Sequence, residues 1–274
     1  MANITIGADP EFAFMSQAGA LTRPDKVIRG NTESEFGIDG SGRVAELRPS
    51  YAGTPKTLVA NIKSVLQYGI ENNPLSAGYR WKAGGTADEE PIGGHIHLGH
   101  SRLCDRGTAQ NVSDALNRIV APLTLMAEDK EEAVLRRAGS SYGQLTGENC
   151  WREQSWGMEY RVLSSWLTSP EDALSVLTMT YLVGKNFDNP EFMDAALELP
   201  EVDNDFFIDC NKRVLSFYLT DIARVMKKAI GFKELYADMK HLFSLIINGK
   251  SFDTSLDMKE TWGLVIPGVP AGAR

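Results

Sequence analysis

The chain has 274 residues and a formal net charge of −8, with 43% hydrophobic and 23% charged residues, which are ordinary values for a globular protein. The acidic balance argues against non-specific nucleic-acid binding and against docking on an anionic membrane, because both need surplus lysine and arginine. Three widely spaced cysteines form no CxxC motif, and we find no signal peptide and no apolar run of about 18 residues. We therefore expect a cytoplasmic protein.

Residues 3–15 are predicted to form one or two short strands. A kink is expected at Asp9-Pro10-Glu11, because proline removes a backbone donor from a strand. Asp9 and Glu11 are two residues apart, so within a strand their side chains share one face. An ordinary Asp-Pro turn is the alternative explanation.

A second polar pair follows the turn at residues 38–42. The segment 43–49 is predicted as a strand with Glu46 and Arg48 on one face, although a solvated strand face has the same pattern. Thr54-Pro55 then predicts the start of a packing helix that reaches about residue 72. Residues 79–83 are predicted as a further strand.

The stretch GGHIHLG at residues 93–99 contains two of the four histidines of the chain. As a strand it places His95 and His97 on one face and Ile96 and Leu98 on the other. The flanking glycines allow the backbone to bend or to approach a ligand. The two histidines are either ligand-binding residues or ordinary structural ones.

Residues 107–138 have a helical pattern, and Pro122 is expected to kink or break this helix. The stretch from Arg136-Arg137 to Arg152 is rich in glycine and serine and is predicted as a loop. Its arginines suit an anion, because guanidinium binds phosphate or carboxylate as a fork. A solvated helix end followed by an irregular loop is the alternative. Glu159 and Arg161 then share one face of a strand predicted at 156–163.

The C-terminal third is predicted to be helical. Ser169-Pro170 begins a helix that runs to about residue 185, and an acidic loop at 198–209 precedes amphipathic helices at about 211–229 and 232–247. We expect a single domain over 1–274. It comprises a sheet core that carries the motifs (1–168), a helical packing region (169–250) and an extended tail (251–274).

Four of the predicted strands carry polar side chains two residues apart: Asp9/Glu11, Glu46/Arg48, His95/His97 and Glu159/Arg161. If these strands form one sheet, its polar face is costly to bury unless the charges are paired or bound to metal. Carboxylates hold metals and arginines hold phosphoryl oxygens, so the set fits a metal–phosphate ligand. Oxygen-rich ligands favour Mg²⁺ or Mn²⁺ over Zn²⁺.

The motifs GADPEF (7–12), DG with ELRP (39–49), GGHIHLG (93–99), RR with YG (136–143) and MEYR (158–161) follow a specific order. This order resembles the phage-type carboxylate–amine ligase family, which is similar to glutamine synthetase and glutamate–cysteine ligase in its catalytic sheet. The resemblance implies an α+β fold, in which helices pack on one side of an antiparallel sheet. It also implies ATP as co-substrate and two or three divalent metals, Mg²⁺ or Mn²⁺.

The resemblance also implies roles for individual residues. The implied metal ligands are Asp9, Glu11, Glu46, His97 and Glu159. The implied catalytic arginines are Arg48, Arg137, Arg152 and Arg161. The residues expected to bind ATP are His95, Arg137 and Arg161. The family pattern is incomplete here, because Asp9 replaces a glutamate and only Glu33 or Glu35 could supply an additional middle glutamate.

The implied reaction is amide formation between a carboxylate and an amine, each on a small molecule or a peptide, through an acyl phosphate. The absence of a GxxxxGK[ST] motif and of a serine or cysteine nucleophile motif agrees with this chemistry. A zinc-dependent hydrolase that uses the HxH motif is one alternative. A non-catalytic protein on a ligase-derived fold is another. The location would be the host cytoplasm if a phage encodes the protein, and an oligomer is compatible with the sequence.

Overall fold

The computed structural model describes residues 3–137, 143–147, 149–202 and 212–268. Its main sheet has the strand order β3-β4-β1-β8-β10-β9, every pair is antiparallel, and β2 and β5 also pair with β1. The strands are β1 (Thr5–Met15), β2 (Leu21–Thr22), β3 (Phe36–Ile38), β4 (Ala45–Leu47), β5 (Arg80–Lys82), β6 (Thr86–Ala87), β7 (Glu90–Pro91), β8 (Gly94–Gly99), β9 (Trp151–Gln154) and β10 (Gly157–Tyr160). The helices are α1 (Pro55–Asn72), α2 (Arg106–Ala127), α3 (Lys130–Arg137), α4 (Pro170–Lys185), α5 (Pro190–Leu197), α7 (Lys212–Met226), α8 (Phe232–Ile247) and α9 (Met258–Thr261).

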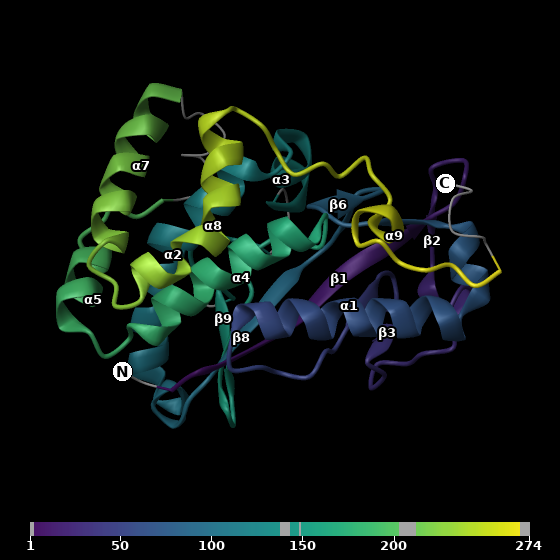
Figure 1. Cartoon of the computed structure of the whole chain (residues 1–274), viewed down its shortest axis with the longest axis horizontal. Coiled ribbons are helices and arrows are strands. Elements are labelled where there is room, and N and C mark those ends of the chain that lie inside the picture. The colour runs from purple at the N-terminus through teal and green to yellow at the C-terminus, as the bar shows by residue number, and fades with distance from the viewer. Residues whose placement is uncertain (1–2, 138–142, 148, 203–211, 269–274) are drawn as a thin grey trace.

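The helices cover one face of the sheet, with α1 and α4 lying over it and α8 packed on α4 (Figure 1). The packing is close where glycine removes a side chain. A Cβ on Gly184 of α4 would come within 2.7 Å of Leu98, and one on Gly69 of α1 within 2.2 Å of Phe36. The predicted α+β fold, with an antiparallel sheet and helices on one side, is confirmed.

Of the two alternatives predicted for residues 3–15, the structure shows a single strand, so Asp9-Pro10-Glu11 does not divide it. β1 runs unbroken through Pro10, which pairs with Gly94 of β8. On the other side of β1, the ladder with β4 begins only at Glu11. Pro10 therefore lies just outside that ladder, where its missing N–H removes none of the ladder hydrogen bonds.

The helix that was expected to kink or break at Pro122 does not end there; it ends five residues later. α2 continues through Pro122 to Ala127, and a short gap at residues 128–129 separates it from α3. Proline leaves the carbonyl four residues earlier without a helical donor. Here that carbonyl belongs to Arg118, and the hydroxyl of Tyr218 donates to it at 2.7 Å.

Three further segments differ from the sequence prediction. Residues 151–154, predicted as loop, form the edge strand β9, and α5 occupies residues 190–197, where no helix was predicted. The short helix α9 lies within the segment expected to be extended. Residues 138–142 and most of the acidic loop lie outside the described residues. None of the described helices is both long and apolar enough to cross a bilayer.

Candidate metal and phosphate site

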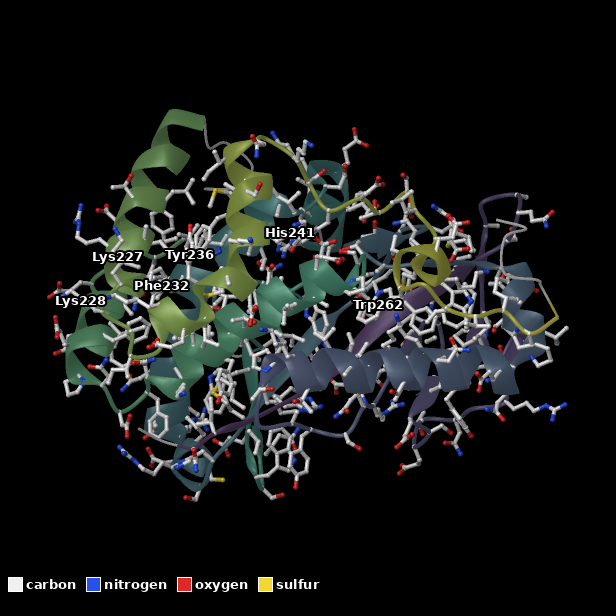
Figure 2. All side chains as sticks on the ribbon, in the orientation of Figure 1. Lys227, Lys228, Phe232, Tyr236, His241 and Trp262 are labelled. Carbon is white, nitrogen blue, oxygen red and sulfur yellow. The ribbon has the colours of Figure 1, made fainter. Side chains whose placement is uncertain are left out.

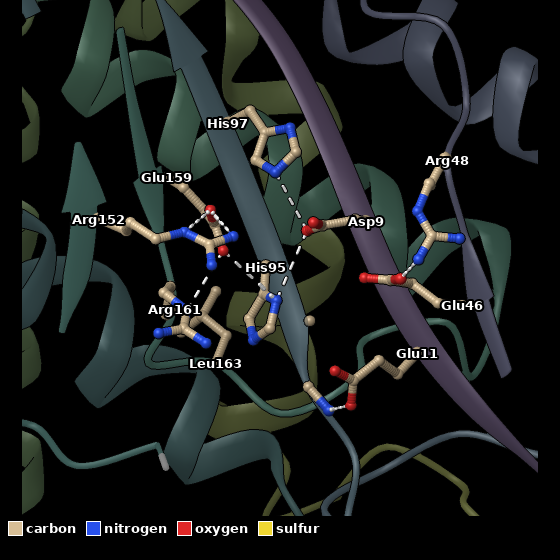
Figure 3. A network of polar contacts seen from close by, with 12 residues as sticks. Asp9, Glu11, Glu46, Arg48, His95, His97, Arg152, Glu159, Arg161 and Leu163 are labelled. Atoms are coloured by element: carbon tan, nitrogen blue, oxygen red, sulfur yellow. Dashed lines mark hydrogen bonds and ion pairs between the residues drawn. The ribbon is translucent and has the colours of Figure 1, made fainter. Parts of the chain in front are cut away.

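Strand register brings the predicted polar pairs onto one face of the sheet. Asp9 of β1 lies opposite His95 of β8, and His97 lies opposite Glu159 of β10. Directly opposed residues of antiparallel strands share a face. The same rule adds Glu46 beside Glu11 and Arg152 beside Glu159. We call this surface the polar face; it consists of Asp9, Glu11, Glu46, His95, His97, Arg152 and Glu159 (Figure 3).

Glu159 is the most deeply buried of these acids, with no exposed surface. Its Oε2 accepts hydrogen bonds from Arg152 Nε and from Gln154 Nε2, each at 2.8 Å. Its Oε1 lies 3.2 Å from Arg161 Nε and 3.7 Å from His95 Nδ1. One carboxylate oxygen is thus held by two donors, while the other is turned toward the imidazole (Figure 3).

Asp9 lies between the two histidines. Its Oδ1 is 3.1 Å from His97 Nε2 and 3.6 Å from His95 Nδ1. Burial alone would raise the pKa of Asp9, but the contacts with His95 and His97 outweigh burial and hold this pKa below its usual range. Burial likewise would lower the pKa of His95, yet the carboxylates of Asp9, Glu11 and Glu159 raise it. The negative charge of the acids and the positive charge of the imidazoles therefore stabilise each other.

Glu11 is positioned by the backbone of the glycine pair that precedes β8. The N–H of Gly93 donates to Glu11 Oε2 at 2.5 Å. A Cβ on Gly93 would come within 2.8 Å of His95 Nε2 and 3.2 Å of both Glu11 oxygens, so only glycine fits there without a shift. Burial raises the pKa of Glu11, and His95 opposes that rise. The glycines before the strand were expected to allow a ligand to approach the backbone, and at Gly93 the group that approaches is the carboxylate of Glu11.

Three sets of side chains have ligand atoms within 4.8 Å of one another. The sets are Asp9–His97–Glu159, Asp9–Glu46–His95 and Glu11–Asp39–Glu46. Each of these three sets of described residues contains at most one imidazole and at least two carboxylates. Such oxygen-rich sets suit Mg²⁺ or Mn²⁺.

The hydrogen bonding of these groups also fits a cation. Asp9 Oδ1, Glu159 Oε1 and His97 Nε2 are buried atoms with no hydrogen-bond partner among the described residues. Buried polar atoms are normally satisfied, because an unmade hydrogen bond costs about 1–3 kcal/mol. All three atoms belong to the Asp9–His97–Glu159 set. These atoms approach Arg161 and each other as ion pairs without a well-formed hydrogen bond, and converging atoms of this kind suit a bound cation.

The four predicted catalytic arginines are placed differently. Arg152 and Arg161 contact Glu159, and Arg152 remains half exposed. Arg48 binds Glu46 and donates to the carbonyls of Ser34 and Ile38. Its described contacts therefore hold the β3–β4 segment together.

Arg137 has described contacts away from the polar face. It forms a buried ion pair with Glu128 at 3.1 Å, and its Nε and one terminal nitrogen have no partner among the described residues. The neighbouring Arg136 donates to the carbonyl of Leu163 and interacts electrostatically with Glu11. Burial, reinforced by Arg137, lowers the pKa of Arg136 to about 10. Arg136, which the sequence did not single out from Arg137, is thus electrostatically linked to Glu11 of the polar face.

Two residues at this site were missed from the sequence. Asp39 joins Glu11 and Glu46, whereas neither Glu33 nor Glu35, the residues considered for a middle acid, enters any of the three sets. Asp39 had been counted as part of a turn and of the DG motif, without a role as a ligand. Gln154 shares a face of β9 with Arg152, and recognising residues 151–154 as a strand would have indicated it.

Helices thus cover one face of the antiparallel sheet, and the carboxylate–imidazole sets lie on the other. A bifunctional glutathione synthetase from Pasteurella multocida is similar to 95% of this chain, with a TM-score of 0.51 and 10% identity. The match covers 48% of that chain, so the present chain spans about half its length. A GmaS/ADP complex matches 90% of this chain and 69% of its own, with a TM-score of 0.48 and 13% identity.

The family model described as phage phiEco32-like COOH.NH2 ligase-type 2 matches residues 6–264. The chain therefore belongs to this carboxylate–amine ligase family, and the resemblance drawn from its motifs is confirmed. No curated protein matches the chain by sequence. At 10% identity, the match to the glutathione synthetase is evidence of fold alone.

Proposed function

We propose that the protein is an ATP-dependent carboxylate–amine ligase that forms an amide bond through an acyl phosphate. The observation that carries this proposal is the convergence on one face, beside two arginines, of buried atoms of Asp9, His97 and Glu159 that make no hydrogen bond among the described residues. Family membership supplies the reaction class. The proposed location is the cytoplasm, that of the host if a phage encodes the chain.

The residues that would hold divalent ions are those of the three sets. They are Asp9, His97 and Glu159; Asp9, Glu46 and His95; and Glu11, Asp39 and Glu46. When bound, Mg²⁺ or Mn²⁺ supplies electrostatic stabilisation of the triphosphate. Arg152 and Arg161 are held beside Glu159 and can direct their remaining N–H groups toward phosphoryl oxygens.

The proposed reaction has two displacements. An oxygen of the substrate carboxylate attacks the γ-phosphorus of ATP, and ADP leaves to give an acyl phosphate. The amine nitrogen then attacks the acyl carbon, phosphate leaves, and the nitrogen loses a proton. The protein's contribution is to fix the reacting groups and stabilise charge, so no covalent protein nucleophile is required.

The geometry favours this chemistry over the zinc-hydrolase alternative. A hydrolase built on the HxH motif needs both imidazoles on one ion. Among the described residues, His95 and His97 fall into separate sets, each with two carboxylates. The alternative also assigns no function to Arg152 and Arg161.

The test is a coupled-substrate assay. Purified protein is incubated with Mg²⁺, ATP and a library of amino acids, peptides and polyamines, while phosphate release and product mass are measured. We expect phosphate and an amide product only when a carboxylate and an amine are both present. Phosphate release that is independent of both substrates, or tightly held stoichiometric zinc, would contradict the proposal.

A further inference from the structure

The two edges of the main sheet differ, because one is covered by its own chain and the other is open. At the covered edge, Ile38 of β3 donates its N–H to the carbonyl of Asn31 at 3.1 Å, and Gly30 packs so closely on the Phe36 carbonyl that a Cβ would clash. At the other edge, β9 pairs only with β10 among the described residues. Proteins usually cover a free strand edge, because its N–H and C=O groups can pair with another chain. The open edge is the one that carries Arg152.

The hydrogen bonding of the β9–β10 ladder shows which backbone groups of β9 face outward. Arg161 donates its N–H to the carbonyl of Cys150 at 2.9 Å, and hydrogen-bonded pairs recur at every second position of an antiparallel ladder. Arg152 is therefore bonded to β10, whereas Trp151 and Glu153 turn their N–H and C=O groups away from it. These four groups have no hydrogen-bond partner in the described ranges of the chain. The edge thus offers two donors and two acceptors to an added strand.

A cavity of about 480 Å³ lies along this edge. It is lined by Trp151, Arg152 and Glu153 of β9, by Arg106 and Gln110 of α2, and by Gly147. The indole N–H of Trp151 donates to Gln110 at 3.0 Å, which holds β9 against α2. Two arginines face one glutamate in this cavity, and the contact between the exposed side chains of Arg106 and Glu153 is long, at 3.9 Å. The charge of the cavity therefore suits an acidic ligand.

Arg152 connects the open edge with the metal and phosphate site. Its Nε and Nη2 contact Glu159 Oε2 across one strand spacing, while its side chain stays 55% exposed. In Figure 3, Arg152 lies on the side of Glu159 that is away from His97 and Asp9. A strand added outside β9 would place one residue directly opposite Arg152, with its side chain on the polar face. An acidic side chain at that position would meet the remaining donors of the guanidinium.

We propose that the β9 edge binds the carboxylate substrate as an extended peptide, with an aspartate or glutamate side chain opposite Arg152; the inference rests on the proposed function. The pairing uses only backbone groups of Trp151 and Glu153, and it brings the acidic side chain to the polar face beside Glu159. There a carboxylate oxygen attacks the γ-phosphorus of ATP and ADP leaves, as in the proposed reaction. A lysine side chain at the same position would be repelled by Arg152, so the edge binds the acid and not the amine.

Matched peptides test the pairing by fluorescence anisotropy. The probe is labelled acetyl-Thr-Val-Glu-Val-Thr-amide, in which the glutamate falls opposite Arg152 and the valines fall opposite Trp151 and Glu153. Methylation of both valine nitrogens removes the two donors that face β9, and we expect the Kd to rise about tenfold. Methylation of the glutamate nitrogen, which faces away from β9, is the matched control and should leave the Kd unchanged. Replacement of the peptide glutamate with lysine should abolish measurable binding.

The protein supplies a second measurement and a control variant. The bound peptide should slow amide hydrogen exchange at Trp151 and Glu153, whose N–H groups lack partners in the described part of the chain. Exchange at Arg152, which is already bonded to β10, should change little. Tyr236→Ala removes an exposed aromatic ring from α8, on the helical side of the molecule (Figure 2), and should bind the peptide like the wild type.

The outcomes separate the edge from the reaction. Undetectable binding of the parent peptide, or equal Kd values for the valine-methylated and glutamate-methylated peptides, overturns the edge pairing and leaves the proposed function intact. Peptide binding with the expected methylation pattern, but without phosphate release with any amine in the coupled-substrate assay, supports the edge and overturns the proposed function.

Discussion

Two glutamates in this chain, Glu132 and Glu159, show how a functional carboxylate differs from a structural one. Glu132 of α3 uses both oxygens: Oε1 accepts from Lys82 at 2.7 Å and from Thr254 at 2.9 Å, and Oε2 accepts from the N–H of Gly85 at 2.8 Å. Glu159 uses only Oε2 for hydrogen bonds, and its Oε1 is buried without one among the described residues.

The two glutamates differ in whether the surrounding residues satisfy both carboxylate oxygens. The Glu132 cluster ties α3 to the segments before β6 and after α8, and every oxygen has a donor, so its contribution is to stability. The surroundings of Glu159 leave an acid, an imidazole and a second acid with converging lone pairs. A folded chain tolerates such unsatisfied groups where a ligand completes them. Glu159 is fully buried and Glu132 is partly buried, but what separates their roles is the hydrogen-bonding capacity that Glu159 Oε1 leaves unused.

The sharpest way to break this comparison is to replace each glutamate with glutamine. Glu159→Gln should abolish measurable ligase turnover. The loss should exceed the roughly 100-fold loss typical when a residue that hydrogen-bonds to a metal ligand is replaced. Its free energy of unfolding should change by less than about 1 kcal/mol, because Arg152 is half exposed and repulsion with Asp9 is relieved. Glu132→Gln should keep the turnover number and destabilise the fold by about 3 kcal/mol, because the partly buried Lys82 loses its charged partner.

Steady-state kinetics and urea unfolding of the two variants measure these effects. Equal loss of turnover in both variants, with both still folded, would show that the comparison has no functional meaning. Equal destabilisation would show that Glu159 is also a structural carboxylate.

Binding of a divalent ion to the carboxylate–imidazole sets should be measurable as an increase in the stability of the fold. We expect Mg²⁺ at a hundred times its Kd to stabilise the wild type by about 2.7 kcal/mol, because it binds only the folded chain. Asp9→Asn should lose most of this stabilisation, since Asp9 belongs to two of the three sets. Glu132→Gln should retain it, although its starting stability is lower.

Thermal unfolding with Mg²⁺, and with Ca²⁺ or Zn²⁺ for comparison, measures the effect. A wild-type midpoint that does not move with Mg²⁺, together with an Asp9→Asn midpoint equal to it, would show that the lone pairs of the polar face do not bind Mg²⁺.

Much of the polar face was predictable because side chains alternate in a strand. Alternation alone placed Asp9 with Glu11 and His95 with His97, and the structure confirms both pairings. Which strands are neighbours is set by contacts far apart in the sequence, so alternation could not show that His97 faces Glu159. The family resemblance named both residues as metal ligands, and the structure shows that they are direct neighbours.

The errors arose where tertiary contacts outweighed a local rule. Pro10 and Pro122 were expected to interrupt their elements. The first lies where β4 has left the ladder, and the carbonyl that the second leaves free is bound by Tyr218. Asp39 was hidden in a turn signal, which describes the backbone but does not reveal where the carboxylate points.

The subtlest prediction concerns Gln154, which donates to Glu159 at 2.8 Å without belonging to any of the three sets. Gln154→Ala should lower the turnover number about tenfold, the lower end for residues that orient a metal ligand. The matched control is Glu153→Ala on the same strand, whose side chain is exposed, faces the other way and only approaches Arg106 at 3.9 Å. If Gln154 acts by orienting Glu159, the loss should shrink when Mn²⁺ replaces Mg²⁺, because Mn²⁺ binds such sites more tightly and tolerates less ideal geometry. An equal loss with both ions, or a loss in Glu153→Ala, would assign the effect to the β9–β10 hairpin as a whole. Gln154, which donates to Glu159 Oε2, would then have no role in orienting Glu159 as a ligand.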